Sequence, residues 1–288
     1  MAESPSHKFG QIVGNQLEEI MKPVLQDFCD SRGLYLDVQG KRSGVRKGKK
    51  VTWLDRYGNS HDLDFVIEKG GTPSQKGRPV AFIEAAWRRY TKHSRNKAQE
   101  IQGAILPIAE EYQWDRPFLG AVLAGVFTQG SLDQLASVGF KVLYFPYDSV
   151  VAAFGNIGID VRFDETTPDE DFANCVAAIE ALDDSAHDRI KQYLIEANGD
   201  LFQSFLKELE RVLDRMIERL IVVPLFGDEH EFHTIESAAS YIDGFAEGEN
   251  GGEFRKYEII AKFSNGDSIE ASFRDKVEAR KFLRYLCG

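Results

Sequence analysis

The stretch HDLDFVIEKGGTPSQKGRPVAFIEAAW, residues 61–87, decides the fold of this 288-residue chain. Its two ends, HDLDFVIE (61–68) and PVAFIEAAW (79–87), are apolar segments on either side of a glycine-containing loop, which predicts two neighbouring strands. Alternate residues of a strand share a face, so Glu84 is the single acid on a face otherwise built for a core. An acid in that position requires a cationic partner.

The first strand adds a second acid to this region. Alternation predicts that Asp64 shares a face with three other residues, Asp62, Val66 and Glu68. If the two strands pair through their loop, Asp64 and Glu84 lie side by side and coordinate Mg²⁺, which accepts one or two carboxylates plus water and phosphate oxygens. Such a site activates water for attack on a phosphodiester. The alternative is that each acid pairs with a nearby arginine: Arg88, Arg89 or Arg95.

The charge distribution marks the same part of the chain. Residues 41–97 contain 15 of the 35 Lys and Arg but five of the 46 Asp and Glu, a net charge of +10, and the rest of the chain sums to −21. Because the whole protein carries −11, any nucleic-acid site must be local, and we expect it in this basic region. The alternative is that the lysines of the run KRSGVRKGKK (41–50) form a solvated hairpin tip.

Several other classes of protein are disfavoured. The three cysteines show neither CxxC nor Cys/His ligand spacing, which argues against disulfides and structural zinc. The chain lacks GxxxxGK[ST], GxGxxG and GxSxG, so a kinase, dehydrogenase or serine hydrolase has no motif to support it. No run approaches the ~18 apolar residues of a membrane span, and the N-terminus lacks the order of a signal peptide. We therefore expect a cytoplasmic protein without membrane contacts.

Hydrophobic periodicity predicts an α/β fold in the first half of the chain. A helix at 8–31 precedes a meander, and a helix at 94–112 precedes two uniformly apolar strands around a short helix capped at Ser131. Uniformly apolar strands indicate a sheet buried on both faces. The predicted strands are 34–38, 50–54, 60–68, 79–86, 119–127 and 141–147.

The second half is predicted to contain helices at 169–182 and 187–220, followed by a weak internal repeat of two strands and a helix. The repeat predicts a small four-stranded sheet with two helices on one face and with three core phenylalanines, Phe226, Phe263 and Phe273. We therefore expect three parts: a core at 1–160, a helical segment at 161–216, and a ββαββα domain for recognition or assembly at 217–288.

The order of these elements, with one acid on a strand and a second acid 20 positions later on the next, resembles the core of the PD-(D/E)XK nuclease superfamily over residues 8–154. The resemblance implies a restriction-endonuclease-like core, a mixed central sheet flanked by helices, in which Asp64 and Glu84 hold Mg²⁺ or Mn²⁺. It implies a DNA endonuclease of restriction or phage-defence type that hydrolyses phosphodiester bonds. A homodimer and a partner methyltransferase are further partners that it suggests.

The chain departs from the family at one position. The family has a lysine two residues after the glutamate, where this chain has Ala86. Three explanations are open: another element supplies the catalytic lysine, the substitution at position 86 has inactivated the site, or the fold serves only to bind nucleic acid and the protein is catalytically inactive. If the lysine has moved, Lys97 is the first candidate and Lys92 the second. Guanidinium and surface ammonium groups suit phosphate binding, which we expect from Arg88, Arg89, Arg95, Lys47, Lys49 and Lys50.

Overall fold

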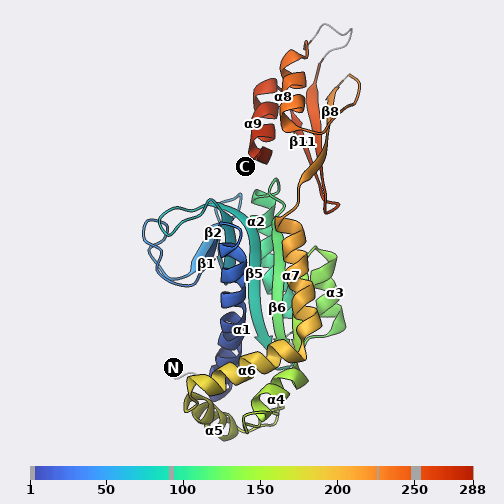
Figure 1. Cartoon of the computed structure of the whole chain (residues 1–288). Coiled ribbons are helices and arrows are strands. Elements are labelled where there is room, and N and C mark those ends of the chain that lie inside the picture. The colour runs from blue at the N-terminus through green and yellow to red at the C-terminus, as the bar shows by residue number, and fades with distance from the viewer. Residues whose placement is uncertain (1–3, 91–93, 226, 248–253, 288) are drawn as a thin grey trace. The chain divides into compact units, whose positions relative to one another are not determined.

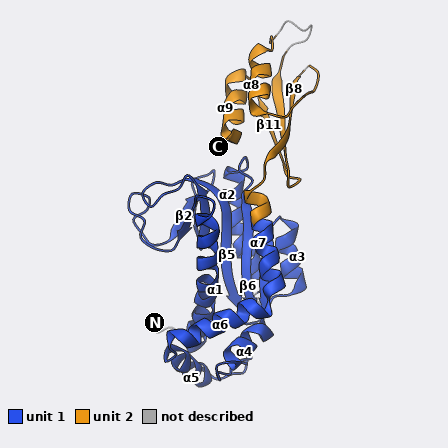
Figure 2. Cartoon of the chain, in the orientation of Figure 1, with its two compact units in different colours: residues 1–209 blue, residues 210–288 orange. Residues whose placement is uncertain are grey.

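The computed structural model describes residues 4–90, 94–225, 227–247 and 254–287 (Figure 1). The chain divides into two compact units, residues 1–209 and 210–288 (Figure 2). The division falls within helix α7 (Gly199–Leu213). Among the described residues, no helix has both the length and the apolar character that a membrane span requires.

The first unit is built on a five-stranded sheet with the order β1-β4-β5-β6-β7. The pairs β1–β4 and β4–β5 are antiparallel, whereas β5–β6 and β6–β7 are parallel, which confirms the predicted α/β class with a mixed central sheet. A separate two-stranded sheet pairs β2 with β3. The strands are β1 (Leu34–Val38), β2 (Val51–Leu54), β3 (Ser60–Leu63), β4 (Phe65–Lys69), β5 (Arg78–Arg88), β6 (Phe118–Gly125) and β7 (Lys141–Pro146).

Helices cover both faces of the five-stranded sheet (Figure 1). On one face, α2 (Ser94–Glu111) and α3 (Gln129–Ser137) join Phe82 and Ala86 of β5 in one buried cluster. On the other face, Phe9 of α1 (Pro5–Asp30) packs edge-on against Trp87 at 6.2 Å, and Phe205 of α7 packs against Phe118 at 5.4 Å. The remaining helices of this unit are α4 (Tyr147–Gly155), α5 (Asp169–Glu180) and α6 (Asp184–Ala197).

The segment predicted as one strand, 60–68, is two strands that join different sheets. β3 ends at Leu63 and pairs with β2, and β4 begins at Phe65 and pairs with β1 and β5, so the chain crosses between sheets at Asp64. The prediction that Asp62 and Glu68 share a face is therefore wrong. Asp62 is exposed, whereas Glu68 is fully buried.

Two predicted helix features are also wrong. The segment 187–220 is not one helix, because α6 is capped at Asn198, whose side-chain amide donates to the carbonyl of Leu194 at 2.9 Å, and α7 ends before the strand β8 (Ile217–Leu225) begins. The cap of α3 is Thr128 and not Ser131, because the Thr128 hydroxyl accepts a hydrogen bond from the Ser131 N–H.

The second unit is a four-stranded antiparallel sheet with two helices, in the predicted order ββαββα. Phe263 and Phe273 are buried in its core as predicted, and Phe226 lies outside the described residues. Helices α8 and α9 contact each other and both contact the sheet. With β8, the elements are β9 (His230–Phe232), α8 (Ile235–Gly244), β10 (Lys256–Phe263), β11 (Ser268–Phe273) and α9 (Lys276–Cys287).

Candidate active site

The pairing of β4 with β5 brings the two predicted carboxylates together. The antiparallel register places Phe65 opposite Ile83. Asp64 precedes Phe65 and Glu84 follows Ile83, so these two acids lie beside each other. The Asp64 Oδ2 atom accepts a hydrogen bond from the Ala85 N–H at 2.8 Å, which fixes the side chain against β5. The site thus forms at the N-terminal end of β4, beyond which β5 continues.

The two carboxylates lie in an environment that disfavours their ionisation. Glu84 is 9% exposed, and its Oε1 atom is buried without a hydrogen-bond partner among the residues that the structure describes. Burial, with a smaller contribution from the negative charge of Asp64, raises the pKa of Glu84 to about 9. Burial also raises the pKa of Asp64, against the opposing effect of the Ala85 N–H. A cation bound between these two groups would remove the cost of holding them so close.

A third carboxylate, Glu18 of α1, was not predicted from the sequence. Glu18 and Asp64 line one hollow of about 260 Å³. Burial and then the charge of Asp64 raise the pKa of Glu18 to about 7. Asn15, Glu18 and Lys22 follow helical spacing, so the sequence does contain a polar stripe here. Such a stripe is more typical of a solvated helix face, and it does not by itself indicate a site.

The part of the chain that the structure describes does not show the alternative arrangement, in which nearby arginines neutralise Asp64 and Glu84. Among the described residues, neither Asp64 nor Glu84 forms an ion pair with an arginine. Arg88 donates to Glu100 at 3.3 Å and to the carbonyl of Trp87 at 3.0 Å. Arg89 stacks on the ring of Phe172 at 4.1 Å, and Arg95 is exposed.

Lys97 is a cation that acts on both acids. It lies in the first turn of α2, and its positive charge lowers the pKa of Asp64 and of Glu84, in opposition to the larger effect of burial. Its Nζ atom also lies 3.3 Å from a carboxylate oxygen of Glu100. Lys92, the second candidate for the moved lysine, lies outside the described residues.

Ala86, which stands where the resemblance to PD-(D/E)XK nucleases calls for a lysine, is part of the core. It is 4% exposed and belongs to the cluster that includes Phe82 of β5 and Ala98 and Ile101 of α2. A lysine at this position would place its aliphatic chain among these apolar side chains. The start of α2, which packs Ala98 and Ile101 against Ala86, also brings Lys97 close to the carboxylates.

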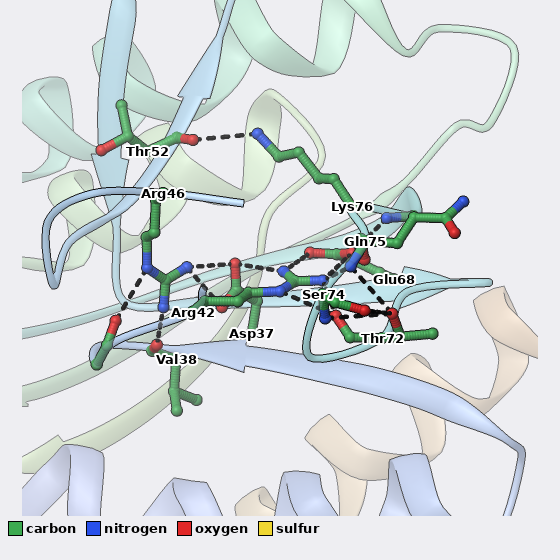
Figure 3. Close-up of polar contacts among 12 residues, drawn as sticks. Asp37, Val38, Arg42, Arg46, Thr52, Glu68, Thr72, Ser74, Gln75 and Lys76 are labelled. Carbon is green, nitrogen blue, oxygen red and sulfur yellow. Dashed lines mark hydrogen bonds and ion pairs between the residues drawn. The ribbon is translucent and has the colours of Figure 1, made fainter. Parts of the chain in front are cut away.

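The basic run 41–50 is partly a buried structural element (Figure 3). The Arg42 side chain is 2% exposed, and its Nη1 atom lies 2.6 Å from Glu68 and 2.8 Å from Asp37. Its guanidinium group also donates to the carbonyls of Thr72 and Gln75, each at 2.8 Å. Arg42 therefore connects its own loop, residues 39–50, and the loop at residues 70–77 to the strands β1 and β4 at the edge of the sheet.

Arg46 completes this network, because its Nη1 atom donates to Asp37 at 2.7 Å and its Nη2 atom donates to the carbonyl of Val38 (Figure 3). Arg42 and Arg46 are thus structural, and the solvated-tip alternative, which concerned the lysines of this run, is not decided by them.

The three lysines of this run that were predicted to contact nucleic acid differ in their surroundings. Lys47 and Lys49 are exposed. Lys50 is exposed too, but its Nζ atom forms an ion pair with Asp62 at 2.6 Å. The other Asp62 oxygen accepts a hydrogen bond from the Thr52 hydroxyl at 2.7 Å. Lys50 is therefore less available to a phosphate than Lys47 and Lys49 are.

The residues present fit Mg²⁺ or Mn²⁺. Among the described residues, no cluster of three or more His, Cys, Asp or Glu side chains has the arrangement of a metal site. Magnesium nevertheless needs only one or two carboxylates when water and phosphate oxygens complete its shell. The buried Oε1 of Glu84, which has no partner within the described part of the chain and lies on the residue beside Asp64, matches that requirement.

Comparison of the chain with protein-family models, with curated proteins and with solved structures finds no match in any of the three. The inference of function therefore depends on the geometry of this site.

Proposed function

We propose that this protein is an Mg²⁺-dependent nuclease that hydrolyses phosphodiester bonds of DNA, of the restriction or phage-defence type. The observation that carries the proposal is the pairing of the buried Glu84 with the partly buried Asp64, two carboxylates that no arginine neutralises among the described residues. This pair lies within the region of the chain with a net charge of +10. A carboxylate pair in locally cationic surroundings suits chemistry on a polyanion.

Each residue has a role that its position supports. Asp64 and Glu84 would hold the divalent ion, with Glu18 close enough to Asp64 to orient a water molecule. The ion supplies Lewis-acid chemistry when it is bound. Lys97 would stabilise the negative charge that develops on the phosphate. Phosphates away from the site would be bound by Lys47, Lys49, Lys50, Arg88, Arg89 and Arg95.

The test is to incubate the purified chain with plasmid, phage and modified DNA in the presence of Mg²⁺ or Mn²⁺. We expect cleavage that requires the metal and that Glu84→Gln abolishes, because the amide keeps the volume but loses the charge. The matched control is Glu170→Gln, which removes one carboxylate from the exposed face of α5 and should cleave as the parent does. Equal cleavage by Glu84→Gln and Glu170→Gln would remove the carboxylate pair from the mechanism.

The second candidate function is a catalytically inactive protein that binds nucleic acid. The burial of Ala86 in the core, where the resemblance calls for a catalytic lysine, favours it. Intact substrates together with salt-sensitive binding would identify this function. The partner methyltransferase follows from the resemblance, and so does the homodimer, for which the predicted single helix at 187–220 was the other support.

A further inference from the structure

The strand β5 continues beyond its neighbour β4 and leaves one edge uncovered. Among the described residues, β4 pairs with β5 as far as Ile83, whereas residues 84–88 pair with β6 and with no other strand. Over this edge lies a groove of about 620 Å³ between α1 and the start of α2. Residues 85–90 contribute from β5 and its end, and Lys97 contributes from α2. The start of the chain and α1 contribute Ser4, Ser6, His7, Gly10, Gln11 and Gly14.

The lining of this groove is suited to an anion. Its charged residues are Arg88, Arg89 and Lys97, and no described lining residue is acidic, although Arg88 and Lys97 each lie 3.3 Å from a carboxylate oxygen of Glu100 outside the lining. The Arg89 Nε and Nη1 atoms are buried and have no hydrogen-bond partner among the described residues, although the guanidinium group is held by stacking on Phe172. These two atoms are too buried to contact a ligand, but the stacked guanidinium group keeps a positive charge beside the groove, which favours an anionic ligand.

The groove lies next to the carboxylate site. Gly14 lines the groove, and the next residue, Asn15, lines the hollow that contains Glu18 and Asp64. On the opposite side, Ala85 lines the groove and donates its N–H to Asp64. One face of α1 therefore changes from small and neutral residues along the groove to carboxylates at the site.

We propose that this groove binds the sugar-phosphate backbone of one nucleic-acid strand, next to the bond that the carboxylate site acts on, and that Gly14 keeps it open. The statement about the adjacent bond rests on the proposed function, but the binding of the strand does not. A Cβ atom at Gly14 would meet nothing within 4 Å, whereas one at Gly10 would lie 3.5 Å from Trp87. A larger side chain at Gly14 would thus occupy groove space without displacing protein atoms near its Cβ.

The test compares Gly14→Leu with Gly103→Leu. Gly103 is an exposed glycine of α2 whose added Cβ would also meet nothing within 4 Å, so both changes replace a helical glycine by a better helix former. Binding of fluorescein-labelled single-stranded DNA and RNA is measured by anisotropy in the full-length Glu84→Gln background, so that the strand is not cut. We expect Gly14→Leu to weaken binding at least about tenfold, whereas Gly103→Leu binds as the parent does and neither lowers Tm.

Two results would contradict the proposal that the groove binds a nucleic-acid strand. One is equal affinities for Gly14→Leu and Gly103→Leu, and the other is no oligonucleotide binding by the parent. A Mn²⁺ titration and a cleavage assay with Glu84 restored separate this outcome from the nuclease proposal. Native cleavage by Gly14→Leu contradicts the groove and supports the nuclease. Weakened strand binding in a chain that binds no Mn²⁺ supports the groove and contradicts the nuclease.

Discussion

Glu84 is held in surroundings that oppose its own ionisation, and this has a consequence for stability. In the unfolded chain the carboxyl loses its proton near its usual pKa of 4.5, but in the folded metal-free protein it keeps the proton up to about pH 9. The folded state therefore binds more protons between these values. The contribution of this residue to stability should be greatest below about pH 4.5 and should fall as the pH rises towards 9, by up to about 1.4 kcal/mol per pH unit for one proton.

Urea unfolding in EDTA across this pH range measures the effect. We expect Glu84→Gln to flatten the dependence and to be more stable than the parent at alkaline pH, because the amide does not ionise. Glu170→Gln, which changes an exposed carboxylate, should retain the slope of the parent. If Glu84→Gln and the parent have the same slope, Glu84 does not keep its proton in the folded protein.

Lys97 is expected to act on the transition state more than on binding. Lys97→Ala should lower turnover on the order of a hundredfold and DNA affinity by much less, because a group that stabilises developing charge contributes mainly to rate even though Lys97 also lines the groove. Lys207→Ala, which removes an exposed lysine from α7, is the control and should leave both quantities unchanged. A loss of affinity equal to the loss of turnover would instead assign Lys97 to phosphate binding.

The site residues that could be predicted from the sequence are the ones that break a pattern. Glu84 stands alone among apolar residues of a strand, and Asp64 precedes an apolar run, so each is conspicuous in the sequence. Glu18 breaks no pattern, because a carboxylate on the polar face of a long helix is ordinary. Its place beside Asp64 follows from the packing of α1 against the sheet, which local sequence does not encode.

At the scale of elements, Arg42 holds two loops on the edge of the sheet. Arg42→Met should destabilise the protein by about 3–5 kcal/mol, because Glu68 and Asp37 would remain buried without this cation. Lys47→Met, a change at an exposed residue of the same loop, should alter the unfolding free energy by no more than about 0.5 kcal/mol. Urea denaturation measures both. A similar small change for the two variants would show that the network does not stabilise the loops.

The same loop supplies the exposed lysines that should bind phosphates. Neutralising Lys47 and Lys49 together should reduce the slope of log affinity against log salt by up to about 0.9 for each phosphate that is no longer neutralised. Neutralising Lys50 should have a smaller effect, because it already pairs with Asp62 at 2.6 Å. DNA binding measured over a range of salt concentrations gives the slopes. An unchanged slope for the Lys47 and Lys49 variant would place the loop outside the DNA-binding surface.

Whether a segment forms a helix or a strand was mostly predictable from the sequence, but the positions where a helix or strand is interrupted were not. β1 and β5 follow local runs of apolar residues, and α2 follows local helical periodicity. The break at Asp64 depends instead on pairing with distant strands, because β3 joins β2 and β4 joins β1. The start of β8, residues 217–220, continues a helical pattern in the sequence, but its strand conformation is fixed by pairing with β10, far along the chain.

At the scale of the whole molecule, charge and site are concentrated in one unit. Every described residue of the carboxylate site, the groove and the basic loop lies within residues 1–209, and the acidic remainder of the chain would repel DNA elsewhere. The ββαββα unit, residues 210–288, holds none of these residues. The role in recognition or assembly that the sequence suggests for this unit remains a prediction.

The anomalous scattering of a crystal grown with Mn²⁺ tests the metal site most directly. A manganese peak between the carboxylates of Asp64 and Glu84, absent from crystals of Glu84→Gln grown in the same way, is the predicted result. Manganese bound at other positions only, or no bound manganese at concentrations that support nuclease activity, would contradict a metal-dependent mechanism at this site.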